Sequence, residues 1–146
     1  MLMASLPIAV IMQWRAIDHP WTSDAWGAVG VVPDHGDLPP MQPLSRTETR
    51  EHYLVSGLRL DLYPDENDGY FENCIAPEPK VFVMWRMQHE RAMPVLASVS
   101  YAEGTRMFDS GDPADGVPMP GEIHAWLAQY LRDHYQPRER RGREHG

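Results

Sequence analysis

The chain has 146 residues, of which 42% are hydrophobic and 23% are charged, and its formal net charge is −8. This length and composition predict a single soluble domain, 1–146, that buries its own hydrophobic core. An acidic protein repels a phosphate backbone, which argues against a nucleic-acid partner. We expect an ordered core at about 6–136 and a flexible, arginine-rich tail at 137–146.

The N-terminus is apolar from Met1 to Met12 but does not resemble a signal peptide. It has no basic segment in front of it, Pro7 interrupts it, and no small-residue cleavage site follows. No apolar run is long enough to span a bilayer. Cys74 is the only cysteine, which excludes an intrachain disulfide and suits a reducing compartment. We therefore expect a cytoplasmic protein without membrane contact.

Six strands are predicted from hydrophobic alternation and from the fourteen prolines, because proline removes a ladder hydrogen bond and is expected at strand ends. The predicted strands are 8–15, 26–32, 47–63, 70–75, 81–87 and 95–101. Gly27 and Gly30 suggest a β-bulge or a close backbone approach. The proline-rich segment 33–43 predicts a surface loop. Six strands in short succession predict antiparallel meander pairing.

The third predicted strand, 47–63, shows the clearest alternation in the chain. Its apolar face carries Leu54, Leu58, Leu60 and Leu62, and its opposite, more polar face carries Tyr53, Val55, Arg59 and Asp61. We therefore expect a half-buried strand. The turn-forming residues 64–69 then lead into the next predicted strand, so 53–75 is predicted to form a β-hairpin.

The segment from Val81 to Met87 predicts the central strand, since every residue except Arg86 is apolar and two prolines precede it. Its length and composition suit a strand buried on both faces. An arginine on an apolar strand face needs a partner or a route to solvent. Arg86 is therefore the residue here that asks for a functional explanation.

The last part of the chain changes to helical spacing. Segment 102–110 predicts a short helix ended by Gly111, segment 112–116 predicts a loop, and a longer helix starts at Pro120. The apolar stripe of the longer helix is Ile123, Trp126, Leu127, Tyr130 and Leu131. The predicted fold class is mainly β (α+β). We expect a six-stranded, curved antiparallel sheet or partly open barrel, with the C-terminal amphipathic helix packed on it or capping it, analogous in element order to a pleckstrin-homology-type barrel.

No pattern in the sequence predicts catalytic residues, a metal site or a bound cofactor. The seven histidines lack HExxH and HxH spacing, and neither a glycine-rich phosphate loop nor a GxSxG elbow is found. Asp34, His35 and Asp37 share one loop, and an enzyme acting through them is the least favoured hypothesis. We expect Cys74 to be a structural thiol.

Tryptophan and arginine carry the remaining signal, because both are enriched at protein–protein hot spots. The chain has five tryptophans, and Lys80 is its only lysine. We predict that Trp21, Arg59, Arg86 and Lys80 bind a protein partner. A structural alternative for the two arginines is an ion pair across strands with Asp61 or Glu72. A second functional hypothesis is a small-molecule or cofactor site at the barrel mouth, where Arg59 and Arg86 would converge on an apolar cavity.

Four strings in the chain carry a resemblance: LPIAV at 6–10, Pro20-Trp21 followed by WGAVGV at 26–31, PEPKVFVMWR at 77–86, and DGVPMP at 115–120. Together they resemble the bacterial family catalogued as domain of unknown function 3305, over about 6–137. The resemblance implies no assigned activity. It does imply genes placed beside those of molybdenum-dependent formate dehydrogenases and their maturation factors. We therefore expect a non-enzymatic accessory protein in the assembly or maturation of such an enzyme.

Overall fold

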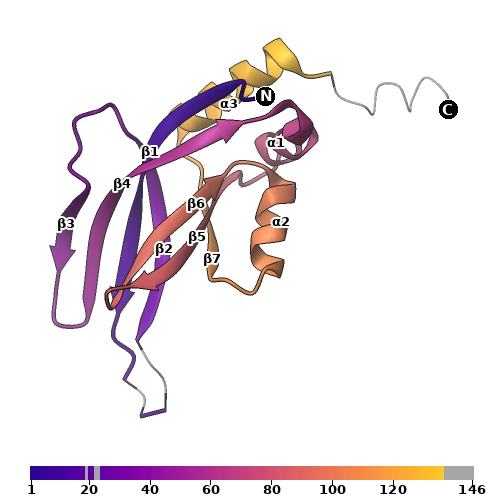
Figure 1. The fold of residues 1–146 in the computed structure, drawn as a ribbon. Helices are drawn as coiled ribbons and strands as arrows, with labels where there is room; N and C mark the ends of the chain where they lie inside the picture. The colour runs from indigo at the N-terminus through magenta and orange to yellow at the C-terminus, as the bar shows by residue number, and fades with distance from the viewer. Residues whose placement is uncertain (19, 22–23, 137–146) are drawn as a thin grey trace.

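The computed structural model describes residues 1–18, 20–21 and 24–136 of the chain (Figure 1). In chain order its elements are β1 (Ala4–Arg15), β2 (Ala25–Pro33), β3 (Met41–Arg46), β4 (Arg50–Leu62), the 3-10 turn η1 (Pro64–Glu66), α1 (Asn67–Cys74), β5 (Lys80–Gln88), β6 (Arg91–Ser98), α2 (Tyr101–Asp109), β7 (Ala114–Pro118) and α3 (Gly121–His134). The predicted tail 137–146 lies outside the described residues. No helix in the described part is long and apolar enough to cross a membrane.

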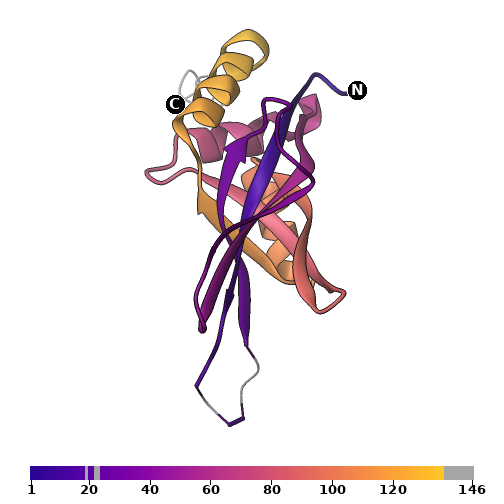
Figure 2. The same ribbon diagram turned by 90° about the vertical axis from the view of Figure 1, so that its left-hand side faces the viewer.

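The strands form two antiparallel sheets, in the orders β2-β1-β4-β3 and β6-β5-β7. Both sheets and α3 contribute buried side chains to one core. α1 and α3 lie together at one end of the sheets, and the β1–β2 hairpin projects from the other end (Figures 1 and 2). The predicted mainly-β class with a packed C-terminal helix is confirmed. The predicted single six-stranded sheet or partly open barrel is confirmed only in its antiparallel pairing, because the strands divide into a four-stranded and a three-stranded sheet.

Two strands were missed because their sequences lack hydrophobic alternation. Every residue of β3 is exposed, and Pro43 lies within the strand, so this segment was predicted as loop. Proline is tolerated there because β3 is an edge strand. β7 has only five residues, among them Gly116 and Pro118, and occupies most of the predicted loop 112–116.

The predicted strand 70–75, and with it the hairpin 53–75, is wrong, because this segment lies in and just after α1. α1 buries Tyr70 and Asn73, which are three residues apart and therefore lie on the same side of a helix. The Asn73 amide donates to the carbonyl oxygens of Lys80 and Val99 and accepts from the Lys80 amide. This one buried side chain thus ties α1 to β5 and to the end of β6.

A bulge in β4 reverses the alternation that the sequence suggested. The register against β1 shifts there, and Gly57 has a φ of +96°, which favours glycine. Before the bulge Tyr53 and Val55 face the core, and after it Leu60 does. The prediction that Tyr53 and Val55 lie on a polar face is therefore wrong, whereas the burial of Leu60 is confirmed.

β5 is confirmed as the central strand of the smaller sheet. Residues 81–83 are buried, but Arg86 near the strand end is exposed, so only the first half of β5 is covered on both faces. β6 starts at Arg91, inside the segment predicted as a polar turn, and ends before Tyr101, which is the first residue of α2. The two predicted helices are confirmed as α2 and α3.

Candidate functional site

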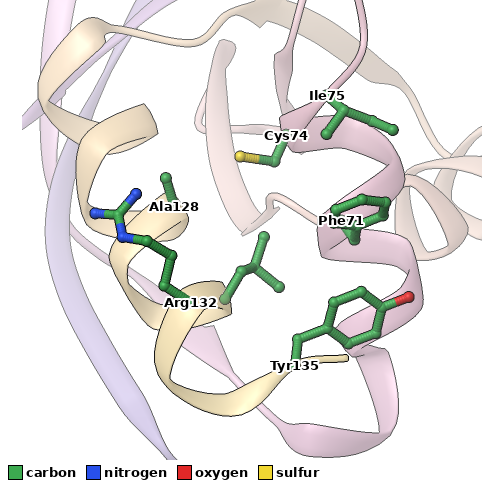
Figure 3. A pocket seen from close by; sticks show the side chains of 7 residues that line it. Phe71, Cys74, Ile75, Ala128, Arg132 and Tyr135 are labelled. Atoms are coloured by element: carbon green, nitrogen blue, oxygen red, sulfur yellow. The ribbon is translucent and has the colours of Figure 1, made fainter. Parts of the chain in front are cut away.

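A surface groove runs between α1 and α3 (Figure 3). Its lining residues are Phe71 and Cys74 from α1, Ile75 just after α1, Ala128, Leu131 and Arg132 from α3, and Tyr135 just after α3. Its volume is about 260 Å³. We call this feature the helix groove. All of its lining residues except Arg132 are uncharged, so it is an apolar surface with a single cation beside it.

Helical spacing brings these side chains together. The three residues on the α1 side follow one another at i, i+3 and i+4, and those from Ala128 to Tyr135 at i, i+3, i+4 and i+7. The rings of Phe71 and Tyr135, with centroids 5.1 Å apart, form one side of the groove. Arg132 lies on the opposite side (Figure 3). A hydrogen bond from the Tyr130 hydroxyl to Asn67 Oδ1, at 2.7 Å, also joins the two helices.

Exposure differs sharply between the floor and the rim of the helix groove. Leu131 is only 7% exposed, whereas Ile75 is 63% exposed. The Ile75 side chain is therefore mostly in contact with solvent and is not part of the hydrophobic core. Covering it would remove apolar surface from water, which favours association.

The thiol of Cys74 also lines the groove. Burial raises the pKa of this thiol, and the charge of Arg132 opposes the shift without cancelling it. At neutral pH the group is therefore a thiol and not a thiolate, and it contributes a small, weakly polar surface. The prediction that Cys74 is not an activated nucleophile agrees with this environment.

Arg132 differs from the better-paired arginines of the protein. Within the described part of the chain, its hydrogen-bond partner is the Gln129 side chain at 2.8 Å, and no carboxylate lies within ion-pair distance. Arg91 and Arg106, by contrast, pair with the carboxylates of Glu51 and Glu66. Arg132 thus holds a charge beside apolar surface without an ion pair to any carboxylate of the described residues.

Two of the predicted partner-binding residues have local partners. Arg86 pairs with Asp112 at 3.3 Å, and not with Glu72 as the structural alternative supposed. The side chain of Arg86 is 57% exposed and that of Asp112 is 38% exposed, so solvent screens the pair and it contributes at most about 1 kcal/mol. Arg59 donates to Ser5 Oγ at 2.9 Å, and this hydroxyl donates to Asp61. Arg59 and Arg86 belong to different sheets and do not converge on one cavity.

The other two predicted residues lie elsewhere. The stem of Lys80, at the start of β5, lies against Gly116 of β7. Trp21 is 87% exposed in the connection between β1 and β2. The four predicted residues are therefore spread over β4, both ends of β5 and the β1–β2 connection, and none of them lines the helix groove.

The loop containing Asp34, His35 and Asp37 does not assemble them around a common point. Asp34 accepts a hydrogen bond from the Gly36 amide, which is a local turn contact, and His35 lies 3.4 Å from Glu122 of α3. Across residues 1–18, 20–21 and 24–136, no group of three or more His, Cys, Asp or Glu side chains is placed to hold a metal ion.

The sequence pattern does not predict the helix groove. Its α1 side lies in the segment that was predicted as a strand, where Phe71, Cys74 and Ile75 do not share a face. On α3 the sequence does indicate one side of the groove. Ala128 and Arg132 are four residues apart and therefore lie together along one edge of the apolar stripe.

A family model described as "Protein of unknown function (DUF3305)" matches residues 7–144. The chain belongs to the DUF3305 family. Comparison with curated proteins and with solved structures found no match.

In this DUF3305 protein, three of the strings that carried the resemblance meet at one carboxylate. Oδ2 of Asp115, in β7, accepts hydrogen bonds from Trp85 Nε1 at 2.8 Å and from the Ala28 amide at 3.0 Å. A Cβ on Gly27 would lie 3.3 Å from the same oxygen. Asp115 therefore joins the two sheets, and these parts of the family strings are explained by the fold and not by a binding site.

Proposed function

We propose that this DUF3305 protein is a non-enzymatic, cytoplasmic accessory protein that binds a protein partner through the helix groove. The observation that carries the proposal is the apolar groove between α1 and α3, with Ile75 63% exposed on its rim. Exposed apolar patches bounded by polar residues mark interaction sites. Arginine and aromatic side chains are enriched at such sites, and the groove combines Arg132 with Phe71 and Tyr135.

The size of the helix groove favours a protein over a small ligand. Pockets for small molecules usually enclose about 300–1,000 Å³ and bury most of the ligand. The helix groove is smaller, at about 260 Å³, and lies open between two helices. One or two apolar side chains of a partner suit it better than a cofactor.

For the partner itself, we propose a subunit or a maturation factor of a molybdenum-dependent formate dehydrogenase. Support for this step comes from the genomic association that the family resemblance implies, and not from the geometry of the groove. An accessory protein would bind an assembling subunit transiently, and a small open groove is compatible with a weak, reversible contact.

Co-purification of the affinity-tagged protein from its native host tests the proposal. The expected result is enrichment of a formate dehydrogenase subunit or maturation factor, identified by mass spectrometry, over a tag-only control. Recovery of neither class from cells that are producing the enzyme would contradict the proposed partner.

A further inference from the structure

The helix groove has the shape that receives another helix. Its floor is Leu131, which is 7% exposed, and its sides are two helices of the same domain. An amphipathic helix commonly binds by laying its apolar face into such a groove, with anchors at i, i+3 and i+4. The volume of about 260 Å³ limits the occupant to one or two apolar anchors.

Arg132 adds a second requirement for the occupant. A partner that covers the groove also takes the guanidinium beside it out of water, and a desolvated charge without a counter-charge is costly. Gln129, the hydrogen-bond partner of Arg132 in the described part of the chain, is neutral, and it links the guanidinium only indirectly to the exposed carboxylate of Asp133. The planar guanidinium matches a carboxylate through paired hydrogen bonds.

The other side of the groove carries a negative charge. The hydroxyl of Tyr135 donates to Asp68 Oδ1 at 2.6 Å, which places a carboxylate on the Tyr135 side. The cation beside the groove lies on the α3 side. An occupant with an acidic side chain on that side would complement it.

We propose that the partner docks an amphipathic helical segment that carries an apolar anchor and a side-chain carboxylate about one helical turn apart. The anchor packs on Leu131 beside Ile75, and the carboxylate pairs with Arg132. This inference rests on the proposed docking function and names the chemistry of the partner at the same groove.

The test uses a phage-displayed library of random dodecapeptides, selected on the full-length protein. Binders that also bind an Ile75→Glu variant are discarded, which leaves groove-dependent peptides. We expect these peptides to share an aspartate or glutamate three or four positions from a large apolar residue. A wild-type-selected peptide should bind the Arg132→Glu variant at least about tenfold more weakly. Selection repeated on Arg132→Glu should replace the acidic residue by lysine or arginine.

Three outcomes of the peptide selection would overturn the inference. They are groove-dependent peptides without an acidic preference, the same peptides from the wild type and from Arg132→Glu, and no groove-dependent peptide at all. Ile75-dependent self-association in analytical ultracentrifugation would likewise assign the groove to a second copy of the chain. Circular dichroism and thermal unfolding establish that each variant is folded. If the partner co-purifies with Arg132→Glu but not with Ile75→Glu, docking at the groove is supported and the proposed carboxylate of the partner is contradicted.

Discussion

Nε2 of His124 lies 2.9 Å from the carbonyl oxygen of Cys74 and 3.5 Å from the Cys74 sulfur. A carbonyl oxygen only accepts hydrogen bonds, so this ring nitrogen carries a proton and has no lone pair with which to remove one from the thiol. The bond ties α3 to the last residue of α1. His124 thus fixes one end of the helix groove and does not activate the cysteine.

The alkylation rate of Cys74 should therefore have a pH midpoint above that of an ordinary thiol. Burial raises its pKa, and the reactive species is the thiolate, so the rate at neutral pH is low and rises as the pH increases. Arg132→Gln removes the cation that opposes the shift, which raises the pKa further and slows the reaction at a fixed pH. Iodoacetamide labelling followed by mass spectrometry over a pH series measures both effects.

His124→Gln serves as the control for this prediction, because the glutamine amide can still donate to the Cys74 carbonyl. If His124 acted as a base, labelling at neutral pH would be fast in the wild type and slow in this variant. We expect similar, slow labelling in both proteins.

Asp115→Ala should lower the free energy of unfolding by about 2–3 kcal/mol. The substitution leaves the Trp85 indole N–H and the Ala28 amide without their acceptor, and it removes a link between the two sheets. Urea denaturation monitored by tryptophan fluorescence measures the change. Asp37→Ala, on an exposed loop residue, is the matched control and should change stability by less than about 0.5 kcal/mol. Equal effects of the two substitutions would show that Asp115 does not join the sheets.

Gly104→Ala should also destabilise the protein, although alanine favours a helix more than glycine does. A Cβ at Gly104 would lie 2.6 Å from Cγ of Phe82, so either the ring or α2 must move. We expect a loss of about 1–3 kcal/mol, as for other overpacked cores. Gly121→Ala, at the start of α3, should be neutral or slightly stabilising, because outside the adjacent backbone no atom lies within 4 Å of the added carbon. Thermal unfolding that is unchanged in Gly104→Ala would refute the close packing of α2 on β5.

The elements predicted correctly are those whose hydrophobic period is long and uninterrupted. The apolar stripe of α3 extends over several helical turns, and the start of β5 is continuously apolar. In both segments the secondary structure predicted from the local pattern is the one found in the fold. β4 was predicted as a strand, but one inserted residue at Gly57 exchanged its faces. A pattern of period two cannot reveal such a shift unless the bulge itself is recognised.

The candidate site could not be predicted, because it depends on α1 and on partners distant in sequence. α1 has only eight residues, and it is held in place by Asn73, which bonds to Lys80 and Val99. No local pattern reports those bonds. The predicted interface rests on residue type alone, and in the structure Arg86 and Arg59 contact Asp112 and Ser5. Residue type does not report which side chains the fold brings together on one surface.

Comparison of two apolar-to-acidic variants is the measurement that tests the docking role of the helix groove most directly. Ile75→Glu places a charge on the groove rim, and Leu96→Glu places the same charge on β6, where Leu96 is 47% exposed and outside the groove. Partner proteins that co-purify with each tagged variant are quantified by mass spectrometry against the wild type. We predict full recovery with Leu96→Glu and a loss of about tenfold or more with Ile75→Glu. Equal recovery with both variants, each shown to be folded, would contradict a partner bound at the helix groove.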